Sequence, residues 1–128
     1  LQPIEGVLEV LRQMKENGIA LGVLTSNSDA NVKHFLQHHG VDFFDFVHSG
    51  SSLFGKARIL KKIYRRLKKE KKYESIFYVG DETRDVEASQ KVGVTSIAVA
   101  WGFTNEEVLR GVNPDILLKS PSELLDCF

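Results

Sequence analysis

Hydrophobic and polar positions along the chain follow two alternating spacings. Apolar residues at Val7, Leu8, Leu11 and Met14 recur every three or four positions, which predicts a helix that Gly18 ends. A continuous apolar run at 19–24 is typical of a buried strand. The alternation continues to the last residue, with helices predicted at 4–17, 29–39, 56–69, 83–91, 105–110 and 120–125, and strands at 19–24, at the end of 43–48, and at 76–79, 95–100 and 115–118.

Strands that alternate with helices indicate βαβ units. We therefore predict an α/β fold in which a parallel, Rossmann-like sheet forms the middle of three layers, with helices on both faces. The 128 residues suit one domain, 1–128, because there is no internal repeat and no linker long enough for a second domain.

Composition excludes some classes of partner. The formal net charge is zero and no apolar run reaches transmembrane length, so we expect neither a nucleic-acid nor a membrane partner. The single cysteine, Cys127, has no second cysteine with which to form an internal disulfide, which favours a reducing, cytoplasmic setting.

Two local patterns have a structural and a functional interpretation. Residues 61–72 contain eight Lys and Arg side chains, which fit the outer face of an amphipathic helix; a nucleic-acid or anionic-lipid patch is the alternative. His34 and His38 have the spacing of a metal pair on a helix, but no third ligand has suitable spacing, which favours surface histidines.

The most informative stretch is 78–85, which follows the apolar strand 76–79. Gly80 lets the backbone turn, and Asp81 and Asp85 come where a helix should begin. Two carboxylates at the end of a parallel strand form a hard-oxygen site of the kind that Mg²⁺ prefers. The alternative is that Asp81 caps the helix and Asp85 is a solvated acid of its first turn.

Other strand ends supply matching chemistry. Residues 25–28 after the first strand carry hydroxyls, and the glycine- and serine-rich loop 49–55 delivers Lys56 at a helix start. Ligands of parallel sheets bind at the carboxyl ends of the strands. Hydroxyls, free backbone N–H groups, a lysine and two carboxylates at one edge suit a Mg²⁺-bound phosphate.

Several of these segments are similar to motifs of the haloacid dehalogenase (HAD) superfamily, and to its phosphoglycolate-phosphatase-like branch. Residues 21–27 resemble the second motif, Lys56 the third, and 80–85 the acidic fourth motif of the form GDxxxD. Residues 3–11 look like the segment that re-enters the core domain after a helical cap. The first motif, DxDxT with its nucleophilic aspartate, is absent, and so is the cap. We expect the chain to be the C-terminal portion of a parent longer by roughly 80 residues.

The resemblance implies a Mg²⁺-dependent phosphoric monoester hydrolase that acts on a small phosphorylated metabolite. Ser26 would donate a hydrogen bond to the phosphoryl oxygens and Asn27 would orient it, with Thr25 as the competing hydroxyl. Lys56 would neutralise developing charge. Asp81 would bind Mg²⁺, and Asp85 would support it from the outer shell or share the role. Without the nucleophile, we expect the isolated chain to be inactive.

The missing first strand would lie in the middle of the sheet in this family. We expect the remaining strands to close up, or another chain to fill the slot, for example in a homodimer through the open sheet edge. The alternative function is a non-catalytic HAD-like binding or scaffold domain. A receiver-like phosphoacceptor domain ranks lower, because it needs an acidic pair after the first strand.

Overall fold

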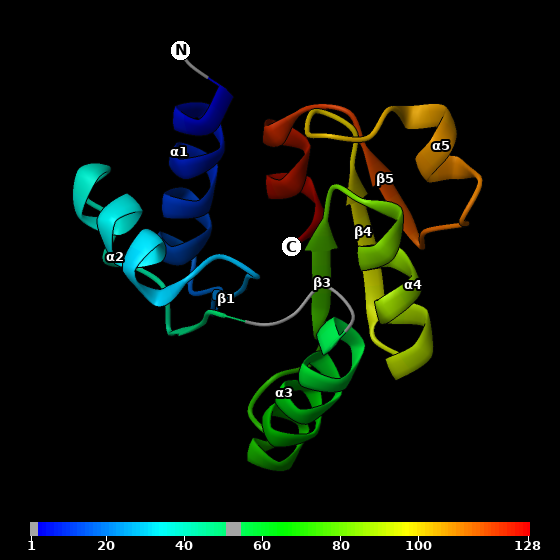
Figure 1. Ribbon diagram of the computed structural model, residues 1–128, viewed down its shortest axis with the longest axis horizontal. Helices are drawn as coiled ribbons and strands as arrows, with labels where there is room; N and C mark the ends of the chain where they lie inside the picture. Colours follow the sequence, from blue (N-terminus) through cyan, green and yellow to red (C-terminus); the bar gives the residue numbers. More distant parts are fainter. Residues whose placement is uncertain (1–2, 51–54) are drawn as a thin grey trace.

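The alternation of helices and strands predicted from the sequence is present in the structure, a computed structural model that describes residues 3–50 and 55–128 (Figure 1). The order of elements is α1 (Pro3–Glu16), β1 (Gly22–Leu24), α2 (Asp29–His38), β2 (Phe46–His48), α3 (Lys56–Glu70), β3 (Phe77–Gly80), α4 (Thr83–Val92), β4 (Thr95–Val99), α5 (Glu106–Arg110), β5 (Ile116–Leu118) and the 3-10 helix η2 (Pro121–Cys127).

The strands form two separate parallel sheets where the sequence predicted one. In the first, β1 pairs with β2, with Val23 opposite Val47. In the second, the order is β3-β4-β5, with Ile97 of β4 opposite Ile116 of β5. All pairs are parallel, as expected for βαβ connections. Among the described strands, only β4 has a neighbour on each side, and its residues are nearly all buried.

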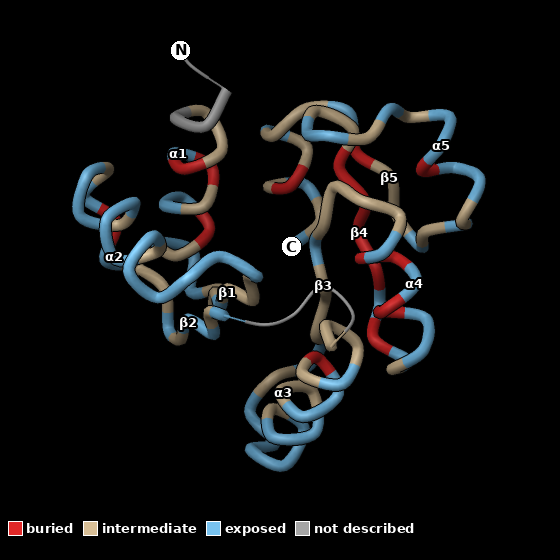
Figure 2. The backbone as a smooth tube through the Cα atoms, in the orientation of Figure 1, coloured by how far each residue is buried: buried red, intermediate tan, exposed pale blue. Residues whose placement is uncertain are grey.

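Side chains of β4 build a core on both faces of the larger sheet, because successive residues of a strand point to opposite faces. Ile97 and Val99 pack against α1, β5 and η2, where Met14 is 3% exposed. Ala98 packs on the other face with Val86 of α4 and Leu109 of α5. Figure 2 shows this buried region running along β4 and α4. The prediction of helices on both faces is confirmed.

A cavity of about 1100 Å³ separates the two sheets. It is lined mainly by apolar residues, with residues 21–24 contributed by the β1 side and residues 76–80 by the β3 side. Neither β1 nor β3 has a partner at the edge that faces the cavity among the described residues. Val79 of β3, a strand residue of a type usually buried, is 41% exposed. The expectation that the strands close up is therefore wrong for this structure; filling by another chain stays a prediction.

Gly22 holds β1 close to β2. A Cβ atom at this position would lie 2.1–2.5 Å from ring carbons of Phe46, its register partner. We predict that Gly22→Ala lowers the free energy of unfolding by about 1–3 kcal/mol, because the ring must move out of its packed position. Urea denaturation followed by circular dichroism measures this change. The control is Gly6→Ala, since nothing lies within 4 Å of that added Cβ; equal stability of the two variants would contradict the prediction.

Candidate active site

The end of β3 and the start of α4 are arranged around the carboxylate of Asp85. A Cβ on Gly80 would lie 2.3–2.4 Å from atoms of the Asp85 side chain, so glycine is needed for this close approach. Glu82 occupies the N-cap position of α4, and its backbone N–H donates to Oδ2 of Asp85 over 3.1 Å. Asp85, and not Asp81, therefore satisfies a free N–H group at the helix start.

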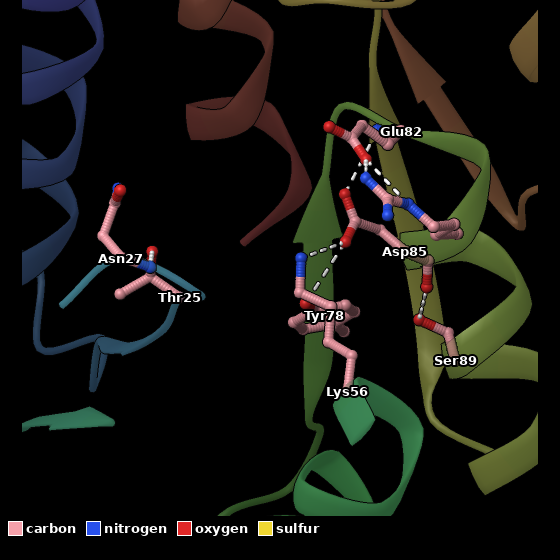
Figure 3. A network of polar contacts seen from close by, with 8 residues as sticks. Thr25, Asn27, Lys56, Tyr78, Glu82, Asp85 and Ser89 are labelled. Carbon is pink, nitrogen blue, oxygen red and sulfur yellow. Dashed lines mark hydrogen bonds and ion pairs between the residues drawn. The ribbon is translucent and has the colours of Figure 1, made fainter. Parts of the chain in front are cut away.

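Lys56 joins this carboxylate from a different element. It is the first residue of α3, and its Nζ donates to Oδ1 of Asp85 over 2.8 Å. The Tyr78 hydroxyl donates to the same oxygen over 3.4 Å (Figure 3). Burial, together with the negative charge of Asp85, raises the pKa of Tyr78 above its usual value, so the hydroxyl stays protonated. Asp85 is only 4% exposed, and both of its oxygens are occupied by protein donors.

Asp81 is placed differently. It lies directly after β3, is half-buried, and accepts one hydrogen bond at Oδ2 from the backbone N–H of Phe103, over 3.1 Å. Its Oδ1 accepts no hydrogen bond from any residue in the described ranges 3–50 and 55–128. Asp81 thus keeps one oxygen available to a ligand, whereas Asp85 does not.

The carboxylates of Asp81 and Asp85 could supply part of the ligand set of a Mg²⁺ ion. Mg²⁺ is usually held by one or two carboxylates together with waters and substrate phosphate, and does not need a cage made only of protein. The described residues contain no group of three or more His, Cys, Asp or Glu side chains able to hold a metal. Asp81 suits direct contact with the ion, and Asp85 suits a supporting position behind it.

The hydroxyl-bearing turn lies after β1. The Thr25 backbone N–H extends the sheet by donating to the His48 carbonyl over 3.0 Å, and its Oγ1 accepts from the Asn27 backbone N–H over 3.2 Å. Ser28 caps α2 by accepting from the Asn31 N–H. Ser26 is exposed, and its side chain has no hydrogen bond to a described residue. The turn therefore uses one lone pair of the Thr25 hydroxyl, whose O–H can still donate, and leaves the Ser26 hydroxyl without a partner among the described residues.

The structure brings some of the predicted site residues together and keeps others apart. Lys56 and Asp85 are in direct contact, and Asp81 is nearby in the chain. Thr25 and Asn27 lie on the other sheet, well away from Lys56 and Asp85 in Figure 3. The cavity is lined by residues of β1 and by Asp81, but not by residues 25–28, Lys56 or Asp85. The candidate site thus consists of two separate halves, the turn after β1 and the end of β3 with Lys56, and of the predicted site residues Asp81 lines the cavity.

Some contributors to the site were not predicted from the sequence. Tyr78 was assigned only as a strand residue, and the Phe103 N–H carries no side-chain signal at all. Trp101 and Phe103 are the two aromatic residues of the loop that follows β4. The structure separates them, because Trp101 packs against the core whereas the Phe103 side chain is 87% exposed.

The remaining candidates have ordinary structural roles. The eight basic residues of 61–72 are all exposed, on α3 and directly after it, while Leu60 is buried. His34 and His38 stack with ring centroids 6.1 Å apart. Asp45, one of the acids outside any motif, accepts from Lys15 and from the Leu21 N–H, and these two hydrogen bonds lower its pKa.

Comparison with known families agrees with this arrangement. The model of the family described as haloacid dehalogenase-like hydrolase matches residues 1–99. The chain belongs to this family. It is 40% identical over 126 residues to a phosphoglycolate phosphatase from Synechococcus elongatus, covering 98% of this chain and 58% of that protein. It is 28% identical over 130 residues to pyrophosphatase PpaX from Halalkalibacterium halodurans, covering 98% of this chain and 60% of that one.

Solved structures support the fold. A protein from Clostridium acetobutylicum described as a predicted phosphatase superposes with a TM-score of 0.73 at 28% identity, covering 98% of this HAD chain and 58% of that one. A HAD-like hydrolase from Streptococcus pneumoniae gives a TM-score of 0.76 at 22% identity, covering 94% and 57%. The chain thus spans a little over half the length of these relatives. In its described part, no helix is long and apolar enough to cross a membrane.

Because Asp81 and Asp85 have different surroundings, we expect their substitution to change the free energy of unfolding by different amounts. We expect Asp85→Ala to lower the free energy of unfolding by about 2–4 kcal/mol, because it leaves Lys56, Tyr78 and the Glu82 N–H without their acceptor. We expect Asp81→Ala to cost about 1 kcal/mol or less, because only one hydrogen bond is lost. Urea denaturation of both variants, followed by Trp101 fluorescence, makes the comparison. Equal losses would contradict the view that only Asp85 has a structural role.

Proposed function

We propose that this chain forms the metal- and phosphate-binding part of a Mg²⁺-dependent phosphoric monoester hydrolase that acts on a small phosphorylated metabolite. One observation carries the proposal: Asp85 holds the Lys56 ammonium over 2.8 Å at the start of α4, and Asp81, four residues earlier at the end of β3, has an oxygen without a donor among the described residues. A cation and an available carboxylate oxygen at one strand end suit a phosphate group together with its metal.

The residues would divide the work as follows. Lys56 neutralises charge on the phosphoryl oxygens, since its position is set by the ion pair with Asp85. Ser26 donates from its hydroxyl, which has no partner among the described residues, and Asn27 orients the phosphate from the same turn. Asp81 holds Mg²⁺, which when bound withdraws charge from the phosphoryl group. Asp85 keeps both Lys56 and the start of α4 in place.

The nucleophile is not assigned to this chain. The sequence lacks the DxDxT motif, so an aspartate that attacks phosphorus must come from elsewhere. We propose that it arrives on an extended segment that enters the cavity between β1 and β3. An extended segment is the shape that offers backbone N–H and C=O groups to two facing strand edges at once. It would also bring the two halves of the site to opposite sides of one strand end.

The expected setting follows from the same sequence features. We propose a cytoplasmic location, because a lone cysteine gives the chain no internal disulfide and this usage is typical of reducing compartments.

We predict that the isolated chain has no phosphatase turnover but binds inorganic phosphate weakly in the presence of Mg²⁺. Lys56→Met should weaken that binding at least tenfold, because the charge facing the phosphate is removed. Lys33→Met is the matched control, since Lys33 also pairs with an aspartate, but on an exposed helix face. Isothermal titration calorimetry measures the binding. Absence of both Mg²⁺ and phosphate binding would favour the scaffold alternative, and turnover by the purified chain would show that its nucleophile is already present.

A second prediction concerns the cavity. When the part of the Synechococcus elongatus relative that lies outside its match to this chain is co-expressed as a separate polypeptide, we expect the two to co-purify. The complex should then hydrolyse phosphoglycolate, the substrate in that relative's name, in a Mg²⁺-dependent way. Pyrophosphate is the comparison substrate. Light scattering of the chain alone tests the homodimer; a monomer that captures no added polypeptide would contradict occupation of the cavity.

A further inference from the structure

The loop after β4 supports Asp81 from behind. The Phe103 backbone N–H donates to Asp81 Oδ2 over 3.1 Å, which leaves Oδ1 as the oxygen without a protein donor in the described residues. A backbone donor has a fixed direction, because it belongs to a loop and not to a rotatable side chain. The position of this loop therefore decides which carboxylate oxygen of Asp81 is offered to a ligand.

Gly102 makes this approach possible. A Cβ atom at Gly102 would lie 2.3 Å from Asp81 Oδ2, 2.6 Å from its Cβ and 2.9 Å from its Cγ. The backbone of Gly102 is not among those with positive φ, so any residue could adopt its conformation. Space for the Asp81 carboxylate is thus what requires glycine here.

The loop is held at both ends, so it acts as a rigid support. At its start, the Ala100 N–H donates to the Leu118 carbonyl over 2.9 Å, and Trp101 packs against the core. At its end, the Asn105 side chain accepts from the Val108 N–H over 3.0 Å and caps α5, whose Leu109 is fully buried. The strain of an added side chain at Gly102 would fall on Asp81, because the loop itself cannot easily move away.

We propose that Gly102 and the backbone N–H of Phe103 are positioning elements for Asp81: together they orient its carboxylate so that Oδ1 faces the metal. This inference rests on the proposed function, in which Asp81 holds Mg²⁺. It adds a contribution that the acidic motif at 80–85 does not contain, from a loop about twenty residues further along the chain. Supporting contacts of this kind change metal affinity by roughly 10- to 100-fold.

The test is Gly102→Ala in the full 128-residue chain. We expect Mg²⁺ affinity, measured by calorimetry with Mg²⁺ alone, to fall at least tenfold. We also expect the Phe103 amide to lose protection in hydrogen exchange, because its acceptor is displaced. Gly6→Ala, which adds the same methyl group where nothing lies within 4 Å, should change neither measurement. Asp81→Ala gives the level expected when the contact is absent altogether.

The two measurements separate this inference from the function on which it rests. Failure of the unaltered chain to bind Mg²⁺ would overturn the proposed metal site, while the exchange of the Phe103 amide still decides whether Asp81 is held by the loop. A Phe103 amide that exchanges equally fast in the unaltered chain and in Asp81→Ala would overturn the positioning role. Unchanged Mg²⁺ affinity in Gly102→Ala would overturn it as well.

Discussion

The buried ion pair between Lys56 and Asp85 is the interaction on which the candidate site depends. It joins the first residue of α3 to the first turn of α4, and Tyr78 of β3 donates to the same carboxylate. Removing two charges from water is costly, and the cost is offset only when the charges are well paired and their remaining hydrogen-bond capacity is used. Here the Glu82 N–H takes the second oxygen of Asp85. The pair therefore holds α3, α4 and β3 together. It also places the Lys56 ammonium at the start of α4, where β3 ends.

This arrangement gives the two acids of the motif separate tasks. Asp85 is buried, paired and part of a helix start, so it works as a structural support for Lys56. Asp81 is held by one backbone N–H and keeps an oxygen available. A carboxylate that offers one oxygen, in the same motif as the partner of a fixed ammonium, suits a metal-bound phosphate, whereas two saturated carboxylates would not.

The strands form two sheets instead of one, and this separates the parts of the candidate site. Parallel strands are usually buried on both faces and paired at both edges, yet β1 and β3 are half-buried and paired at one edge only. The cavity between them is lined by β1 on one side and by β3 and Asp81 on the other. The same missing contact thus explains the exposed Val79 and the separation of the two halves of the site.

Sequence by itself determined the order of elements, the α/β class, the family and the strand ends where Lys56 and the two acids would be found. The order of elements, the class and the strand ends follow from local spacing and from residues that act at their own position in the chain, such as a glycine after an apolar strand. The family follows from the resemblance of several segments to its motifs. Only the tertiary structure decided that Asp85 pairs with Lys56, that Ser28 and not Ser26 caps α2, and that Gly102 leaves room for Asp81. These contacts join residues that are distant in the chain, or depend on side-chain directions, and spacing along a sequence does not encode either.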